Sequence, residues 1–269
     1  MILGYDTGTS AVKIVAVDGD RIVATKCIVG SGMEAEQLLS EFVREKGIDE
    51  RCIQVLAATG VGAEKCRFGS LADRVVIIPE IEATGAGGSW LSGLDETVVV
   101  SIGTGTSIAL ARNGSYTHIG GSGVGSGTLR GIAKKMYGLS DLCDFFKLAE
   151  TGNRLTVDIT IGDLFSGMDT LPLDLTASNL AKASDGATES DWALAIINTV
   201  MEVAGSHAAL ACNGYKVQSV VITGGISQTG IAKKVYDGFS KLYGLNYVIP
   251  KFSGCATAIG AARRAMHDA

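Results

Sequence analysis

The stretch TVVVSIGTGTS, residues 97–107, joins a run of apolar residues to a turn made of glycines and small hydroxyl residues. The run Val98–Val100 predicts a buried strand. Glycine at the end of a strand costs backbone entropy, and it is tolerated where the chain bends sharply or another group approaches the backbone closely. A phosphate is one candidate for that group, because turn amides and hydroxyls bind its oxygens. The stretch therefore predicts a strand that ends in a phosphate-binding turn.

The beginning of the chain shows the same pattern. Three short strands are predicted between residues 2 and 28, and the turn between the first two is DTGTS, residues 6–10. After a polar break at residues 93–96, three more strands are predicted up to residue 119, with GTGTS at 103–107 between the first two. We interpret this recurrence as an internal duplication of shape within an α/β chain.

Composition favours an enzyme that acts on small molecules. The 269 residues, 46% of them hydrophobic, can bury two cores of about 100–150 residues each. A formal net charge of -5 argues against a nucleic-acid or anionic-membrane partner. No basic leader precedes the first predicted strand, and the apolar runs fall short of the roughly 20 residues that span a bilayer. We therefore expect a cytoplasmic protein, whose six scattered cysteines are reduced core residues rather than metal ligands.

The two glycine-rich turns form the candidate nucleotide site. Their amides and hydroxyls would bind phosphate oxygens, and Lys13 on the next strand would neutralise a transferring phosphoryl group. Asp6 adds a carboxylate where a hydrated Mg²⁺ would be held through water, since this ion takes few carboxylate oxygens and keeps several waters. The candidate phosphate-binding residues of the two turns are Asp6, Thr7, Gly8, Thr9, Ser10, Lys13, Gly103, Thr104, Gly105, Thr106 and Ser107.

These turns give the chain a resemblance to known families. A strand–DxGT–strand unit followed by a strand–GTGTS–strand unit resembles the actin, Hsp70 and sugar kinase superfamily. The resemblance implies a two-lobed actin-like ATPase fold, built from duplicated ribonuclease H-like domains, that binds ATP in the cleft between the lobes. The order of the elements over nearly the whole chain is similar to that of type II pantothenate kinases, with the closest correspondence at residues 98–179, which include DLTASN at 174–179 and LAETGNR at 148–154.

The family resemblance implies an activity and a division of the chain. The activity is the ATP- and Mg²⁺-dependent phosphorylation of the primary hydroxyl of pantothenate to 4'-phosphopantothenate, the first step of coenzyme A biosynthesis. Residues 1–96 would form an N-terminal lobe with the first turn and the catalytic glutamate. Residues 97–269 would form a C-terminal lobe whose final helix packs back on the N-terminal lobe. Relatives in the superfamily are commonly dimers, and the apolar helix expected at 191–211 is the candidate dimer helix.

Glu80 is the candidate catalytic residue. In the segment Pro79–Ala83 it follows a predicted strand and opens a helix, where the family carries its catalytic glutamate. A carboxylate at such an edge can take or orient a hydroxyl proton, although positioning and charge stabilisation contribute most to phosphoryl transfer. The alternative is that Glu80 and Glu82 only stabilise the helix N-terminus.

Other glycines extend the candidate site. The run Gly120–Gly131 leads into a helix, so that Gly125 and Gly127 would present amides to the triphosphate. A structural loop is the alternative. The turn Gly224-Gly225 resembles the adenosine-contacting turn of the superfamily. Thr176 is a candidate substrate residue, and a helix cap is its alternative role.

One position departs from the family pattern. His118 stands before Ile119-Gly120-Gly121, where well-studied members carry an arginine that binds substrate or transferring phosphate. A neutral imidazole lacks the fixed charge and the bidentate geometry of guanidinium, which makes substrate identity less certain than ATP use. Arg112 or Arg130 could supply the missing positive charge, but neither is at the matching position, and we expect a surface or structural role for each. The candidate substrate-binding residues are His118, Gly121 and Thr176.

Other functions stay open at this point. An ATPase like the activator of 2-hydroxyacyl-CoA dehydratases shares the fold but needs cysteine thiolates for its Fe–S cluster, and Gly120–Gly131 contains none. A kinase of another small alcohol, such as an amino sugar, is a second alternative, although no sugar-binding Asn/Asp segment precedes Thr97. A non-catalytic ATP sensor is a third, because His118 replaces an expected charge.

Overall fold

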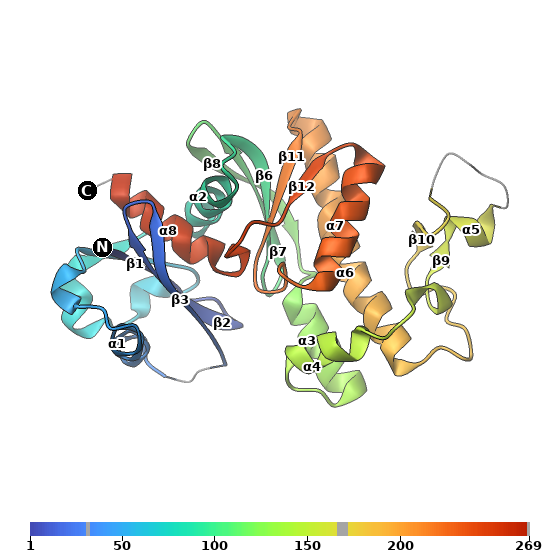
Figure 1. The fold of residues 1–269 in the computed structure, drawn as a ribbon, viewed down its shortest axis with the longest axis horizontal. Helices are drawn as coiled ribbons and strands as arrows, with labels where there is room; N and C mark the ends of the chain where they lie inside the picture. Colours follow the sequence, from blue (N-terminus) through green and yellow to red (C-terminus); the bar gives the residue numbers. More distant parts are fainter. Residues whose placement is uncertain (31–32, 166–171, 268–269) are drawn as a thin grey trace.

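Two five-stranded mixed sheets form the framework of the molecule, as seen in the computed structural model, which describes residues 1–30, 33–165 and 172–267 (Figure 1). The first sheet has the spatial order β3 (Arg21–Val29), β2 (Ala11–Asp18), β1 (Ile2–Asp6), β4 (Val55–Thr59) and β5 (Val75–Ile77). The second sheet has the order β8 (Ser115–Ser122), β7 (Thr106–Arg112), β6 (Glu96–Ile102), β11 (Ser219–Thr223) and β12 (Asn246–Val248).

The two sheets share one topology. In each, an antiparallel meander of three strands is extended on the side of its first strand by two parallel strands. Strand β1 is completely buried, and the central residues of β6 are buried as well, because helices cover both faces of the sheets. The predicted internal duplication and the predicted two-lobed α/β fold are confirmed. The prediction that the cysteines are core residues is wrong for Cys27, Cys52 and Cys143, which are exposed.

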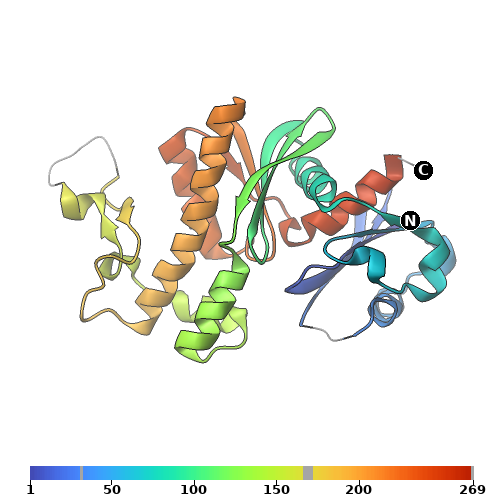
Figure 2. The ribbon, with the colours of Figure 1, turned by 180° about the vertical axis from the view of Figure 1, so that it is seen from behind.

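Helices cover the outer faces of the two sheets. Helix α1 (Ala35–Glu45) places Leu38, Leu39 and Phe42 against the first sheet. Helices α3 (Ser126–Tyr137), α4 (Leu142–Ala149), α6 (Glu189–Tyr215) and α7 (Gly230–Tyr243) enclose the core of the second sheet (Figure 2). Short 3-10 helices lie at Glu50–Cys52, Ala63–Lys65, Gly69–Arg74, Arg154–Thr156 and Ser253–Cys255.

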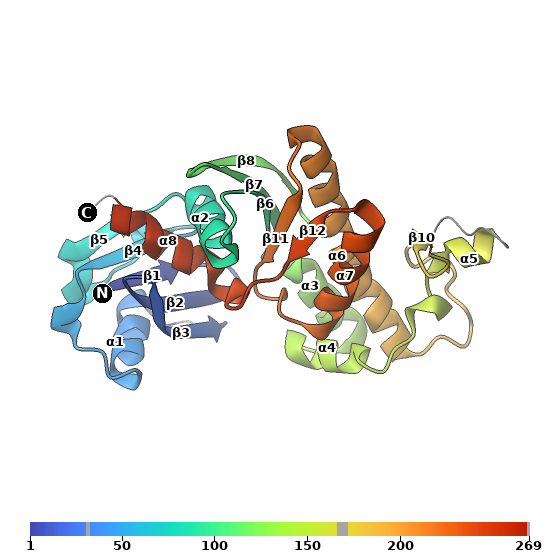
Figure 3. The same cartoon turned by 45° about the horizontal axis from the view of Figure 1, so that its top comes forward.

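Helices α2 (Glu80–Ser92) and α8 (Ala256–His267) form the layer between the sheets (Figure 3). Alanines of α8 pack on the inner face of the first sheet, and α2 packs on β6, β7, β8 and β11 of the second. The two helices approach each other at glycines: a Cβ on Gly87 would overlap the carbonyl oxygen of Ala256, and one on Gly260 would overlap that of Ala83. The final helix of the chain therefore lies against the first sheet.

A small arm leaves the body of the second lobe (Figure 1). It contains β9 (Ile159–Thr160), the short helix α5 (Ile161–Leu164) and β10 (Thr176–Ser178), and β9 pairs with β10 in antiparallel orientation. The sequence interpretation contained no strand here, and the alternative of a helix cap at Thr176 is wrong, because this residue begins a strand.

Helix α6 is the described helix that is long and apolar enough to cross a bilayer, and 61% of its most apolar window is buried inside the protein. Its alanine- and isoleucine-rich face packs against the second sheet. Burial against the sheet accounts for the apolar composition of α6.

The start of α6 is fixed by a reciprocal cap. The carboxylate of Asp191 accepts hydrogen bonds from the backbone amides of Thr188 (2.8 Å) and Asn153 (2.6 Å). These hydrogen bonds to the charged form lower the pKa of Asp191. Replacement of Asp191 by Ala is expected to lower the free energy of unfolding by about 1–2 kcal/mol at pH 7. The lowered folded-state pKa means that this contribution is present above the ordinary value of 3.8 and is lost as pH falls through the folded pKa.

Urea unfolding of the wild type and Asp191→Ala at pH 7 and in a series of acidic buffers measures this difference. The difference in the free energy of unfolding between the wild type and Asp191→Ala should disappear at acidic pH. A gap that stays constant with pH would contradict a role for the ionised carboxylate.

Candidate active site

The two glycine-rich turns meet between the lobes. The first joins β1 to β2, and the second joins β6 to β7. The hydroxyls of Ser10 and Thr104, one from each turn, are hydrogen-bonded at 2.8 Å. The turns border a cleft of about 560 Å³ with residues from both lobes in its walls. Residues far apart in sequence thus contribute to one concave site, as the strand pattern predicts.

Most of the predicted site residues line this cleft. Thr7 does not line it, because its hydroxyl lies 3.1 Å from the carbonyl oxygen of Thr59 and 3.0 Å from that of Val61, which ties the first turn to β4. The predicted residues in the cleft wall are Asp6, Gly8, Thr9, Ser10, Lys13, Glu80, Gly103, Thr104, Gly105, Thr106, Ser107, Gly224 and Gly225.

Asp6 and Lys13 form an ion pair at the end of the cleft on the first lobe. They are opposite each other in the β1–β2 register, and the Lys13 Nζ lies 3.1 Å from the Asp6 Oδ2. Burial raises the pKa of Asp6, and the nearby Lys13 opposes this shift. Lys13 is hydrogen-bonded to one oxygen of the Asp6 carboxylate, Oδ2. The other oxygen can therefore bind a second cation.

Glu80 stands at the first position of α2, directly after Pro79 ends the connection from β5. It lines the same cleft as Asp6. The partial loss of water around its carboxyl in the cleft and the negative charge of Asp6 raise the pKa of Glu80, and Lys13 lowers it. A carboxyl with a raised pKa accepts protons better at neutral pH, which suits a general base.

The glycine-rich run before α3 supports the second turn from behind. The amides of Ser126 and Gly127 donate to the carbonyls of Gly103 (2.8 Å) and Thr104 (2.9 Å). A Cβ on Gly125 would lie 2.6 Å from the Thr104 carbonyl oxygen. Gly125 and Gly127 therefore lie outside the cleft wall. The Gly127 amide bonds to the second turn, and the Gly125 amide donates to the Thr128 Oγ1 at 3.2 Å.

The Gly224-Gly225 turn closes another side of the cleft. Gly224 has a φ of 102°, a conformation that L side chains rarely adopt, and a Cβ there would overlap the backbone of Ile102 at the end of β6. Its amide donates to the Ser253 carbonyl at 3.0 Å. The glycine is thus required by the close approach of β11 and β6 at the cleft edge.

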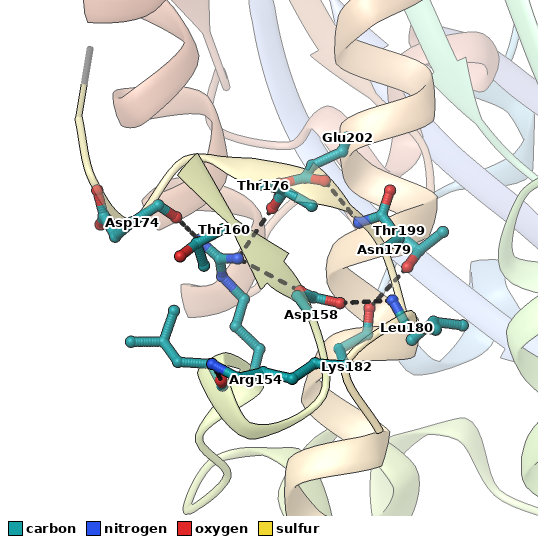
Figure 4. A network of polar contacts seen from close by, with 12 residues as sticks. Arg154, Asp158, Thr160, Asp174, Thr176, Asn179, Leu180, Lys182, Thr199 and Glu202 are labelled. Atoms are coloured by element: carbon teal, nitrogen blue, oxygen red, sulfur yellow. Dashed lines mark hydrogen bonds and ion pairs between the residues drawn. The ribbon is translucent and has the colours of Figure 1, made fainter. Parts of the chain in front are cut away.

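The three predicted substrate residues lie outside the cleft of this single chain. His118 is exposed on β8, opposite Ala109 and next to an irregularity in the strand pairing. Gly121 is on the same strand, against the backbone of Thr106. Thr176 belongs to the arm, where its hydroxyl donates to Glu202 at 2.7 Å and accepts from Arg154 at 2.9 Å (Figure 4). The Thr176 hydroxyl is therefore engaged within the protein.

A polar network holds the arm on α6 (Figure 4). The fully buried Asp158 accepts from the Arg154 guanidinium at 3.3 Å and from the Leu180 amide at 2.9 Å. Asn179 donates to Glu202 of α6 at 2.7 Å. The LAETGNR and DLTASN segments that resemble the pantothenate kinases thus come together in one network.

The sequence interpretation missed part of the cleft. Arg130 of α3 lines it, although a surface or structural role was expected, while Arg112 donates to the Tyr215 carbonyl outside it, as expected. Leu142, Phe146 and Glu150 of the α4 region also line the cleft. Their spacing predicts a helix, but only the packing of α3 and α4 beside the second turn brings this helix to the site.

Comparisons with known proteins identify relatives of this chain. The Fumble family model matches residues 96–237. A type II pantothenate kinase of Bacillus anthracis is 27% identical over 96% of this chain and 95% of that protein. One from Bacillus cereus strain G9842 is 30% identical over 70% of this chain and 68% of that protein.

Among solved structures, the activator of the 2-hydroxyisocaproyl-CoA dehydratase from Clostridium difficile, with bound ADPNP, has a TM-score of 0.70 at 18% identity. The superposition covers 99% of this chain and 94% of that chain, and it shows a shared fold. The Fumble model spans more than half of the 269 residues, and the Bacillus relatives match across both lobes. The chain belongs to the type II pantothenate kinase family.

Proposed function

We propose that this chain is an ATP-dependent kinase that phosphorylates pantothenate to 4'-phosphopantothenate, the first step of coenzyme A biosynthesis. The observation that carries the proposal is the meeting of two glycine-rich turns and Glu80 in one cleft. Turn amides and hydroxyls suit phosphate oxygens, and a carboxylate beside them suits an alcohol acceptor. The names of the Bacillus relatives support pantothenate as that alcohol.

The donor groups of the cleft fit Mg²⁺ bound to nucleotide phosphates. The described residues contain no cluster of three or more His, Cys, Asp or Glu side chains that would hold a metal ion alone. Mg²⁺ in kinases uses one or two carboxylates, waters and phosphate oxygens, so Asp6 would suffice, acting through water. When bound, Mg²⁺ neutralises charge on the phosphates.

The residues of the chain have separate tasks in this reaction. Lys13 and the two turns hold the phosphate oxygens and stabilise their charge. Glu80 orients the primary hydroxyl of the acceptor and takes its proton as the oxygen attacks the terminal phosphorus and the bond to the bridging oxygen breaks. Ser107 supplies a hydroxyl to the cleft, since its buried Oγ has no hydrogen-bond partner among the described residues.

ATP consumption with pantothenate, pantetheine and N-acetylglucosamine, measured side by side, tests the proposal. We expect turnover with pantothenate. Turnover with the amino sugar alone would instead assign a sugar kinase. ATP hydrolysis without any acceptor, combined with cysteine-dependent iron uptake, would assign an activator-type ATPase.

We also propose that the protein is a cytoplasmic homodimer. Apolar side chains remain exposed at the C-terminal part of α6 and on the arm, among them Leu210 (68% exposed), Leu164 (56%) and Leu173 (54%). Association through these surfaces would remove them from water. Light scattering coupled to gel filtration tests this, and a monomeric mass at micromolar concentration would contradict it.

A further inference from the structure

We propose that Arg130 is a further nucleotide-binding residue, whose guanidinium binds the α-phosphate of ATP. The inference rests on the proposed use of ATP. It assigns a nucleotide-binding role to a side chain for which the sequence favoured a surface or structural role.

Arg130 lines the same cleft as the second turn and the residues of α4. It follows Ser126 by four residues on α3, so both side chains are on one face of the helix, and both residues line the cleft. The Ser126 amide donates to the Gly103 carbonyl, which fixes the start of α3 against the second turn. Leu142, at the start of α4, lines the cleft as well.

The Arg130 guanidinium has an unused donor. Its Nε is buried and makes no hydrogen bond to any residue that the structure describes. The Ser107 Oγ, also in the cleft wall, is in the same state. A buried donor without a partner destabilises a folded protein, so two such groups beside one cleft indicate that a ligand supplies the acceptor.

Charge in the cleft leads to the same assignment. Lys13 is paired with Asp6, and Lys147 is paired with Asp144 at 3.0 Å. Of the basic side chains that the structure describes in the cleft wall, Arg130 is the one with neither an ion pair nor a hydrogen bond. Guanidinium keeps its charge at any physiological pH and binds phosphate oxygens through fixed N–H groups, so an anionic ligand suits it.

The position of Arg130 selects the α-phosphate. The charged groups that act on Glu80 are Asp6 and Lys13, on the first lobe. Arg130 lies on the second lobe, whose Gly224-Gly225 turn is the candidate adenosine contact. In a nucleotide that runs from this turn to Glu80, the phosphate nearest the nucleoside is on the side of the second lobe, to which Arg130 belongs.

Dissociation constants measured by calorimetry, without an acceptor, test this assignment. The ligands are ATP, ADP, AMP and adenosine, and the proteins are the wild type, Arg130→Met and Arg130→Lys. We expect Arg130→Met to weaken all three phosphorylated ligands at least about tenfold and to leave adenosine within twofold. Arg130→Lys retains the charge but loses the planar donor group. Its dissociation constants for the phosphorylated ligands should therefore lie between those of the wild type and of Arg130→Met.

Arg112→Met is the matched control, because Arg112 pairs with Glu96 outside the cleft and its loss should leave all four constants unchanged. Melting curves verify that each variant is folded. Equal binding of ATP by the wild type and both Arg130 variants would overturn the role of Arg130 alone. If Arg130→Met weakened the binding of adenosine by the same factor as the binding of ATP, ADP and AMP, the assignment to a phosphate would also be overturned. A wild type that binds no ATP would overturn the proposed function with it.

Discussion

Replacement of Glu80 by Gln is expected to lower kcat by a factor of about 10²–10⁴, because the amide cannot accept the proton of the acceptor hydroxyl. Substrate binding should change much less than kcat, since the amide has nearly the same size. Steady-state kinetics of the wild type and Glu80→Gln measures this effect. Retention of more than a tenth of the wild-type kcat would show that Glu80 is not the base.

Glu82→Gln is the matched control for this substitution. Glu82 is two residues further along α2, pairs with Arg264 at 3.3 Å and does not line the cleft. Glu82→Gln removes one negative charge from the first turn of α2, as Glu80→Gln does. We therefore expect a kcat close to that of the wild type, which would separate catalysis from stabilisation of the helix N-terminus.

The pH dependence of kcat/KM should report the ionisation of Glu80. Its pKa is raised from the ordinary 4.5, first by partial loss of water around the carboxyl and then by the charge of Asp6. The active form of the base is the carboxylate, so kcat/KM should fall as pH drops through the raised pKa and be constant above it. The acid limb should therefore lie above pH 4.5 and disappear in Glu80→Gln.

Replacement of Gly87 by Val is expected to prevent stable folding. Any Cβ at this position meets the Ala256 backbone at the crossing of α2 and α8, and a branched side chain forces the two helices apart. We expect a loss of at least about 3 kcal/mol in the free energy of unfolding, which is among the larger effects of single substitutions. Soluble yield and thermal melting measure it.

Gly238→Ala is the control for this experiment. Gly238 is also inside a helix, α7, but a Cβ there meets nothing within 4 Å. Because alanine favours helix over glycine, we expect this variant to be as stable as the wild type or slightly more so. A Gly87→Val protein with wild-type stability would contradict the close crossing of α2 and α8.

The sequence predicts those parts of the fold that depend on local pattern. Alternation and turn residues locate the strands of both meanders, and the repeat of DTGTS and GTGTS locates both glycine-rich turns of the cleft. Glu80 is found because one short segment contains the end of a strand and the start of a helix. These predictions need no knowledge of tertiary packing.

The remaining parts of the site depend on packing between distant segments. The first amides of α3 look available in the sequence, but those of Ser126 and Gly127 bond to the carbonyls of Gly103 and Thr104. Arg130 looks like a surface residue of an amphipathic helix until α4 is placed across from it. The pairing in the arm joins Thr160 to Thr176, and its two-residue and three-residue strands are too short to give a periodic signal.

The hydrogen bond between Ser10 and Thr104 has a thermodynamic consequence for ligand affinity. Each hydroxyl is the partner of the other across the lobes, at 2.8 Å. An anion that takes both hydroxyls must first separate them, so binding is an exchange reaction in which one internal hydrogen bond is given up. The measured affinity is then the net result of forming bonds to the anion and breaking this one, and Ser10→Ala removes a competitor as well as a donor.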